Sequence, residues 1–159
     1  MDILIIDHHE AKQVSPYACV INNQLCDYPN KSLSGVGMVY KFCCYLDQLL
    51  GVSYADNYLD LVALGMIADM MDLRDFETKH LIQLGCESVR SPFIKMMMAR
   101  NEFSIKGQLT PFTVGFYIAP YINAVARVGT QEETLLLAEA MLEYRAYEQI
   151  PSTKRGCSG

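Results

Sequence analysis

The sequence predicts an α/β fold in which a parallel sheet is flanked by helices and the second half of the chain is largely helical. Three observations predict this class. Residues 3–6 (ILII) form a continuous apolar run, which is typical of a strand buried on both faces of a parallel sheet. A second short apolar segment, residues 18–23, follows Ser15-Pro16. From residue 35 onward, apolar side chains recur at the spacing of helices.

The first two predicted helices follow from this spacing and from their end signals. Apolar residues at three- and four-residue intervals, with Gly51 as the C-terminal cap, predict a helix over residues 35–50. Residues 56–73 (DNYLDLVALGMIADMMDL) are apolar on most sides and predict a mostly buried helix. There we expect Asn57 to be the N-cap, with Asp60 three residues on as in a capping box.

The later helices are predicted by capping residues and prolines. Asp75 is expected to cap a helix that turns Phe76 and Leu81 toward the core. A further helix is expected after Ser91-Pro92, because proline suits the first helical turn, and Gly107 and Thr110-Pro111 mark an interruption before the following segment. A final helix is expected over residues 131–149. We expect one partial domain over residues 1–145 and a linker or tail over residues 146–159.

Composition and charge exclude several classes of protein. The 159 residues contain no apolar run long enough for a membrane span, and no basic region precedes the first apolar run as it would in a signal peptide. The six cysteines have no C-x-x-C or zinc spacing, so free thiols in a reducing cytoplasm are expected. A net charge of −5 argues against nucleic-acid binding through the overall field. An anionic substrate would therefore need bound cations or another part of the protein.

The first group of residues with chemical potential is Asp7, His8 and His9, at the carboxyl end of the first strand. Ligands of open α/β sheets bind beyond this end of the strands. Side chains alternate along a strand, so Asp7 and His9 should share one side while His8 points to the other. This arrangement suits a metal site in which His8 binds the ion. The alternative is a solvated strand end with no function.

Asp69 is the second candidate. It lies near the end of an apolar helix, where a carboxylate opposes the helix dipole, and its sequence neighbours offer no partner. Burying it without compensation would be costly, and a divalent cation is a common remedy. The alternative is that Asp69 reaches solvent as the helix ends.

The third candidate is the pair Asn123 and Arg127, which are four residues apart and therefore on one face of a helix. The arginine fork binds phosphate through two hydrogen bonds, and asparagine adds a donor and an acceptor. The alternative is a structural Asn123 beside a surface Arg127.

Four blocks, in order, resemble a known family. Residues 3–10 (ILIIDHHE) resemble the signature of the DHH phosphoesterase superfamily. The segments SLSGVGMVYKF, LDLVALGMIADMMDL and VGFYIAPYINAVARVG resemble the following blocks of its RecJ branch, the 5′-to-3′ exonucleases specific for single-stranded DNA. The resemblance covers residues 2 to about 145 and implies a DHH phosphoesterase domain with two manganese or magnesium ions at the carboxyl edge of its sheet.

The resemblance also implies a role for each matching residue. By this resemblance, His8 and Asp69 bind metal, His9 faces the scissile phosphate, and Asp7 orients the group. Gly35 and Gly37 match the glycine block beside the site, and Asn123 and Arg127 match a block that contacts the nucleic-acid backbone. Single-stranded DNA is then the expected partner of a cytoplasmic enzyme of DNA repair and recombination, with replication or repair proteins as further partners.

Two parts of the family pattern are not found in this sequence. These are the aspartate-rich motif D-x-D-x-D-G with a further metal-binding aspartate, and the glycine- and histidine-rich C-terminal domain. We therefore expect the chain to be a middle segment of a RecJ-like nuclease, inactive alone. The alternatives are a DHH-type phosphodiesterase of oligoribonucleotides or cyclic dinucleotides, and a catalytically dead binding module.

Overall fold

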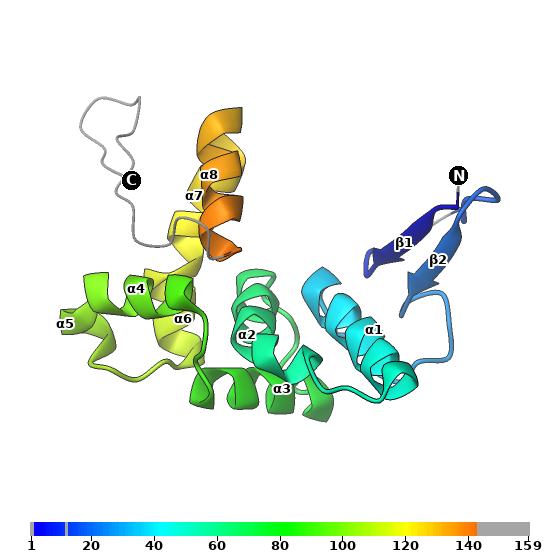
Figure 1. Ribbon diagram of the computed structural model, residues 1–159, viewed down its shortest axis with the longest axis horizontal. Coiled ribbons are helices and arrows are strands. Elements are labelled where there is room, and N and C mark those ends of the chain that lie inside the picture. The colour runs from blue at the N-terminus through cyan, green and yellow to red at the C-terminus, as the bar shows by residue number, and fades with distance from the viewer. Residues whose placement is uncertain (1, 12, 143–159) are drawn as a thin grey trace. The chain divides into compact units, whose positions relative to one another are not determined.

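A computed structural model describes residues 2–11 and 13–142 of the chain (Figure 1). It contains two compact units, residues 1–88 and the part from Val89 onward. Each unit is described by itself. The predicted tail over residues 146–159, its boundary at residue 145 and the last part of the helix predicted to reach residue 149 lie outside the described residues.

The first unit begins with two parallel strands, β1 (Leu4–Asp7) and β2 (Cys19–Asn22). Their register pairs Leu4 with Cys19 and Asp7 with Asn22. Both strands therefore end at the same edge of the sheet, as the two arrows in Figure 1 show. This confirms the two predicted strands and their parallel arrangement.

The prediction that the first strand is buried on both faces is wrong for the described residues. Leu4 is 47% exposed, and Ile3 and Ile5 are also exposed. Only Ile6 of this run packs against the core of the first unit, together with Ile21 of β2. A parallel strand becomes buried only when elements cover both of its faces, and the described part of the sheet has two strands.

Helix α1 (Gly35–Leu50) follows the strands and confirms the predicted range. It ends because Gly51 adopts a left-handed conformation, with φ of 67°, and donates its backbone N–H to the Asp47 carbonyl. Few residues other than glycine adopt this conformation at low cost.

Helix α2 (Leu59–Ala68) begins later than predicted. A short 3₁₀ turn, η1 (Ala55–Tyr58), precedes it and includes Asn57, so Tyr58 and not Asn57 occupies the N-cap position. The Asp47 carboxylate fixes the start of this turn by accepting hydrogen bonds from the backbone N–H groups of Tyr54 and Ala55, each at 2.7 Å. This contact from α1 holds Asn57 inside the 3₁₀ turn, so the helix starts after it.

Helix α3 (Phe76–Glu87) begins as predicted, because the Asp75 carboxylate accepts the backbone N–H groups of Glu77 and Thr78. Phe76, however, is exposed and stacks on His80 with ring centroids 5.9 Å apart, so its predicted core position is wrong. Helices α2 and α3 pack closely around Gly85, where a Cβ atom would overlap the Leu59 carbonyl oxygen. The core cluster consists of Leu33, Met38, Leu59, Val62, Met66, Leu81 and Ile82.

The loop between β2 and α1 is anchored to α3 by a charged group. Glu77 accepts hydrogen bonds from the Tyr28 hydroxyl at 2.8 Å and the Asn30 amide at 3.0 Å, and its carboxylate lies 2.8 Å from the Lys41 ammonium. Burial by itself raises the pKa of Glu77, but the hydrogen bonds from Lys41, Tyr28 and Asn30 outweigh it and lower the pKa below its usual value. This network connects the loop with α1 and α3.

The second unit is helical in its described part, as predicted for the second half of the chain. Thr110 and Thr130 begin two of its helices with capping boxes, and Pro92 lies in the first turn of another. The helices are α4 (Pro92–Arg100), α5 (Glu102–Ile105), α6 (Pro111–Tyr117), α7 (Ala119–Val128) and α8 (Gln131–Met141).

The helices and the cysteines of the described residues can be compared with the expectations from composition. None of the helices within residues 2–11 and 13–142 has the length and apolar character needed to cross a membrane. The cysteines in this part of the chain, Cys19, Cys26, Cys43, Cys44 and Cys86, are free thiols, and Cys157 lies outside it.

Candidate functional site

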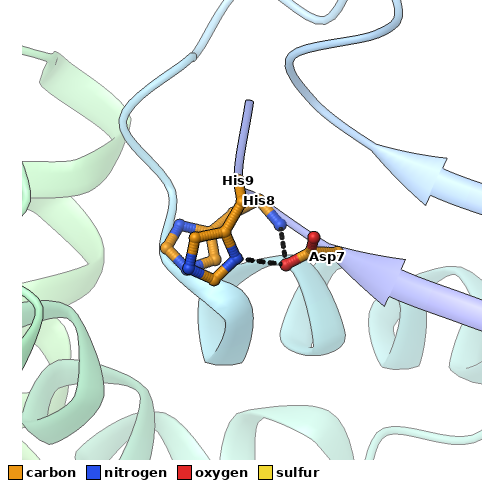
Figure 2. A group of neighbouring side chains, drawn as sticks. All are labelled: Asp7, His8 and His9. Carbon is orange, nitrogen blue, oxygen red and sulfur yellow. Dashed lines mark hydrogen bonds and ion pairs between the residues drawn. The ribbon is translucent and has the colours of Figure 1, made fainter. Parts of the chain in front are cut away.

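The candidate site starts where β1 ends. Asp7 is the last residue of β1, and its Oδ1 atom accepts the backbone N–H of His8 at 2.8 Å and lies 2.7 Å from Nδ1 of His9 (Figure 2). The hydrogen bond with His9, followed by that from the His8 backbone, lowers the pKa of Asp7. The carboxylate therefore stays ionised and holds the His9 ring in place, as expected for side chains on the same side of a strand.

His8 points toward a different partner. Its Nε2 atom lies 4.0 Å from Oδ2 of Asp69, at the end of α2, and its side chain is only 17% exposed. The His8 ring also lies beside the start of α1, since a Cβ atom on Gly35 would be 3.5 Å from its Cδ2 atom. The structure thus brings together His8 and Asp69, which are far apart in the sequence.

Asp69 owes its position to the way α2 ends. Met70, the next residue, has a left-handed backbone with φ of 54°. The N–H of Met70 bonds to the Ile67 carbonyl and that of Met71 to the Met66 carbonyl, the pattern of a Schellman motif. This motif fixes the backbone of Asp69 as the helix C-cap.

The expectation that Asp69 is a buried carboxylate is wrong, because its side chain is 50% exposed. Desolvation therefore gives no argument for a metal at this position. The geometric argument remains, since the carboxylate lies next to the His8 imidazole at the carboxyl edge of the strands.

The donor atoms at this edge fit a divalent cation. Possible ligand atoms of Asp7, His8 and His9 all lie within 4.8 Å of one another. Bonds of about 2.0–2.2 Å to small divalent ions also let one ion reach donors about 4 Å apart, which is the separation of His8 and Asp69. The chemistry of the set, carboxylate oxygens with imidazole, suits manganese. The structure therefore offers Asp7 and His9 as donors in addition to His8 and Asp69.

The glycine block lies at the start of α1. Gly35 is the first residue of the helix and adjoins His8, whereas Gly37 is buried, with Leu33 and Met66 as its nearest side chains. The Ser34 hydroxyl at the N-cap is buried without a hydrogen-bond partner. Gly35 is thus positioned beside the candidate site, and Gly37 serves close packing of the core.

Asn22 was not recognised in the sequence as a site residue. It is the last residue of β2, and its Nδ2 group donates a hydrogen bond of 2.9 Å to the carbonyl oxygen of His9. Its position at the carboxyl end of a strand parallel to β1 was the available signal, because such strand ends meet at one edge.

Asn123 and Arg127 belong to the second unit. Both lie on α7, where four-residue spacing places them on one face, as predicted. Arg127 is exposed in the last turn, and Asn123 is half-buried. The helix ends at Gly129, where a Cβ atom would overlap the Val125 carbonyl. Asn123 and Arg127 therefore lie in a different unit from the other candidate residues.

A likeness to a solved structure shows the fold class. The crystal structure of exonuclease RecJ bound to manganese matches with a TM-score of 0.77 and 24% sequence identity over 91% of this chain and 36% of that chain. The described part of the chain therefore has the α/β fold of the matching part of that exonuclease.

Sequence comparison finds relatives that are named as exonucleases. The chain is 42% identical to the SPbeta prophage-derived single-strand DNA-specific exonuclease YorK of Bacillus subtilis, over 99% of this chain and 27% of YorK. It is 35% identical to the single-stranded-DNA-specific exonuclease RecJ of the same organism, over 90% of this chain and 18% of RecJ. By sequence, the chain is similar to one part of these two exonucleases. It spans about a quarter of the length of YorK, and no protein-family model matches it.

Proposed function

We propose that the protein to which this chain belongs hydrolyses phosphodiester bonds in single-stranded DNA from the 5′ end, using manganese or magnesium ions. The observation that carries the proposal is the approach of His8 Nε2 to Asp69 Oδ2 at 4.0 Å. Two segments distant in sequence here present an imidazole and a carboxylate at the carboxyl edge of a parallel sheet. The names of the relatives, YorK and RecJ, support single-stranded DNA as the substrate.

The residues at the strand end have complementary roles in this proposal. His8 and Asp69 hold the metal, which when bound supplies an activated water and stabilises the leaving oxygen. Asp7 keeps the His9 ring in one orientation through Nδ1, so that Nε2 of His9 is available to face the scissile phosphate. The ionised state of Asp7 favours this orientation at neutral pH.

Substrate binding involves both units in this proposal. The first 88 residues carry twelve Asp and Glu against five Lys and Arg, so this unit repels phosphate unless cations are bound. Gly35, beside His8, lets the start of α1 lie near a bound strand. Gly37 matches the same block and supports it through packing. Asn123 and Arg127 on α7 contact the DNA backbone, since residues from Val89 onward carry a small excess of basic groups.

The metal part of the proposal is tested by His8→Ala, with His80→Ala as the matched control. His80 is an exposed histidine on α3 that stacks on Phe76 and lies outside the candidate site. We expect His8→Ala to weaken manganese binding, measured by electron paramagnetic resonance of free Mn²⁺, and His80→Ala to leave it unchanged. Equal binding by the wild type and both variants would contradict the role of His8.

Activity is tested on the chain and on the whole protein. His8 and Asp69 supply only two protein ligands, too few for the coordination of two octahedral ions, so we expect the purified chain alone not to degrade DNA. Efficient manganese-dependent degradation by this chain would contradict that expectation. In the whole protein, His9→Ala should lower turnover severely and leave the metal content near normal.

A substrate panel separates the proposal from its alternatives. Single-stranded DNA with a free 5′ end should be degraded, whereas a preference for oligoribonucleotides or cyclic dinucleotides would identify a different phosphodiesterase. Binding without hydrolysis by the whole protein would identify a binding module. We place the protein in the cytoplasm, in DNA repair and recombination, with replication or repair proteins as further partners.

A further inference from the structure

Asn22 makes two hydrogen bonds with opposite ends of its side-chain amide. Its Nδ2 group donates to the His9 carbonyl at 2.9 Å, and its Oδ1 atom accepts the backbone N–H of Gln24 at 2.8 Å. The residue is only 4% exposed. A carbonyl requires a donor and an N–H requires an acceptor, so these two partners fix the orientation of the amide.

The position of Asn22 explains why this contact matters. It is paired in register with Asp7, the last residue of β1, while His9 lies beyond the end of that strand. The hydrogen bond therefore reaches from the end of β2 to the backbone of the exposed histidine. It acts on the same short turn in which Asp7 binds the His8 N–H and the His9 ring.

We propose that Asn22 is a positioning residue for the turn formed by Asp7, His8 and His9. By holding the His9 carbonyl, it limits rotation of the backbone on which the two imidazoles stand, and so keeps their nitrogen atoms at the edge of the sheet. The effect of Asn22 on metal affinity rests on the proposed function. Its restraint of the turn does not, because it depends only on the hydrogen bond to His9 within this chain.

The neighbouring Asn23 provides a matched comparison. It is also fully buried, and its Nδ2 group also donates to a backbone carbonyl, that of Asn30, at 3.0 Å. Asn30 in turn donates to Thr78 on α3. Asn23 therefore anchors the following loop and, unlike Asn22, does not contact the turn at His9.

The test compares Asn22→Leu with Asn23→Leu in the full chain. Leucine has nearly the shape of asparagine and adds no charge, so each variant leaves a backbone carbonyl without its amide donor. Both should lower the melting temperature. Only Asn22→Leu should accelerate hydrogen exchange of the His8 amide, which Asp7 protects. It should also weaken Mn²⁺ binding about 10–100-fold, as is typical when a residue supporting a metal ligand is removed.

The outcomes are distinguishable from a failure of the proposed function. If His8 exchange is the same in both variants, or is unchanged in Asn22→Leu, the inference is overturned. The wild-type chain could bind no Mn²⁺ while the exchange rate of the His8 amide rises only in Asn22→Leu. That result would support the positioning role of Asn22 and contradict a metal site in this chain. If Asn22→Leu does not fold, Asn22→Asp and Asn23→Asp replace the pair. Aspartate keeps the acceptor for Gln24 and removes the donor to His9, so the same exchange difference is expected.

Discussion

The strand pair and the helical layer of the first unit differ in how they use apolar residues. In the helical layer, Met66 and Ile82 are almost completely buried, whereas Leu4 of the equally apolar β1 is half exposed. Asp7, His8 and His9 stand at the end of this exposed strand, and Asp69 stands where α2 ends beside it. The comparison teaches that the helices hold the buried core of the unit, whereas the candidate site lies at the exposed end of the strands, where α2 also ends.

Truncating the core should have the largest effect. Met66→Ala should lower the free energy of unfolding by about 2–5 kcal/mol, because it removes a fully buried side chain and leaves a cavity. Leu4→Ala should cost less than about 1.5 kcal/mol, since Leu4 has lost only half of its contact with water. Urea denaturation measures both values. Equal losses would show that β1 is as strongly packed in solution as the helices.

The anchor at Glu77 should have the next largest effect. Glu77→Gln should cost about 1.5–3 kcal/mol at pH 7, the range for hydrogen bonds to a charged group. The folded-state pKa of Glu77 is below its usual 4.5, so this contribution is complete above that pH and is lost as the pH falls through the folded-state value. Urea denaturation of both proteins between pH 7 and pH 3 should show the difference shrinking.

Glu87→Gln is the control for this measurement, because Glu87 lies on the same helix and is exposed. Its effect should be small at every pH. If the difference in free energy of unfolding between the wild type and Glu77→Gln did not change with pH, the shape of the Glu77 side chain and not its charge would account for its stabilising effect.

Adding one methyl group should affect the contact between α2 and α3 more than the start of α1 beside the candidate site. Gly85→Ala should cost about 1–3 kcal/mol, because the new Cβ overlaps the Leu59 carbonyl and lies 2.6 Å from Ala63 Cβ. Gly35→Ala, next to the site, should be nearly neutral, since its Cβ would make an ordinary contact of 3.5 Å with His8. Melting temperatures of the two variants check this. A larger drop in melting temperature for Gly35→Ala would show that the start of α1 is packed more tightly against His8 than α3 is against α2.

The smallest expected effect is the loss of one helix cap. Asp75→Ala should cost about 1 kcal/mol, because two backbone N–H groups of α3 lose their acceptor. Asp75→Asn should retain most of the stability, since asparagine is also a good N-cap. Thermal unfolding followed by circular dichroism measures the difference. A loss in Asp75→Asn as large as in Asp75→Ala would show that charge dominates over hydrogen bonding.

Local signals in the sequence predicted both strands, the range of α1 and the starts of α3 and α4. They missed the end of α2, which the pattern extended to residue 73 and the structure places at Ala68. Gly51, Asp75 and Pro92 act within a few residues of their own helix ends, so their effect can be predicted without the fold. The start of α2 was wrong because Asp47, a residue from another helix, fixes the turn that includes Asn57.

The candidate site was predictable in its residue types and less so in its geometry. The strand-end position of Asp7, His8 and His9 follows from the pattern, and the resemblance to RecJ paired His8 with Asp69. The exposure of Asp69 and the role of Asn22 depend on how distant segments meet, which spacing alone does not determine. Burial of β1 likewise depends on elements that cover it.

The left-handed Met70 after α2 has an angular consequence for the site. Successive residues of an α-helix are rotated by about 100° around the axis, since one turn takes 3.6 residues. If the carboxylate stood one residue earlier on α2, it would project about 100° away around the axis and lose its approach to His8. The two hydrogen bonds that close the Schellman motif fix the end of the helix at one residue. The C-cap of α2 thus keeps the carboxylate of the candidate site on the helix face that adjoins His8, and a methionine occupies the left-handed position that is usually a glycine.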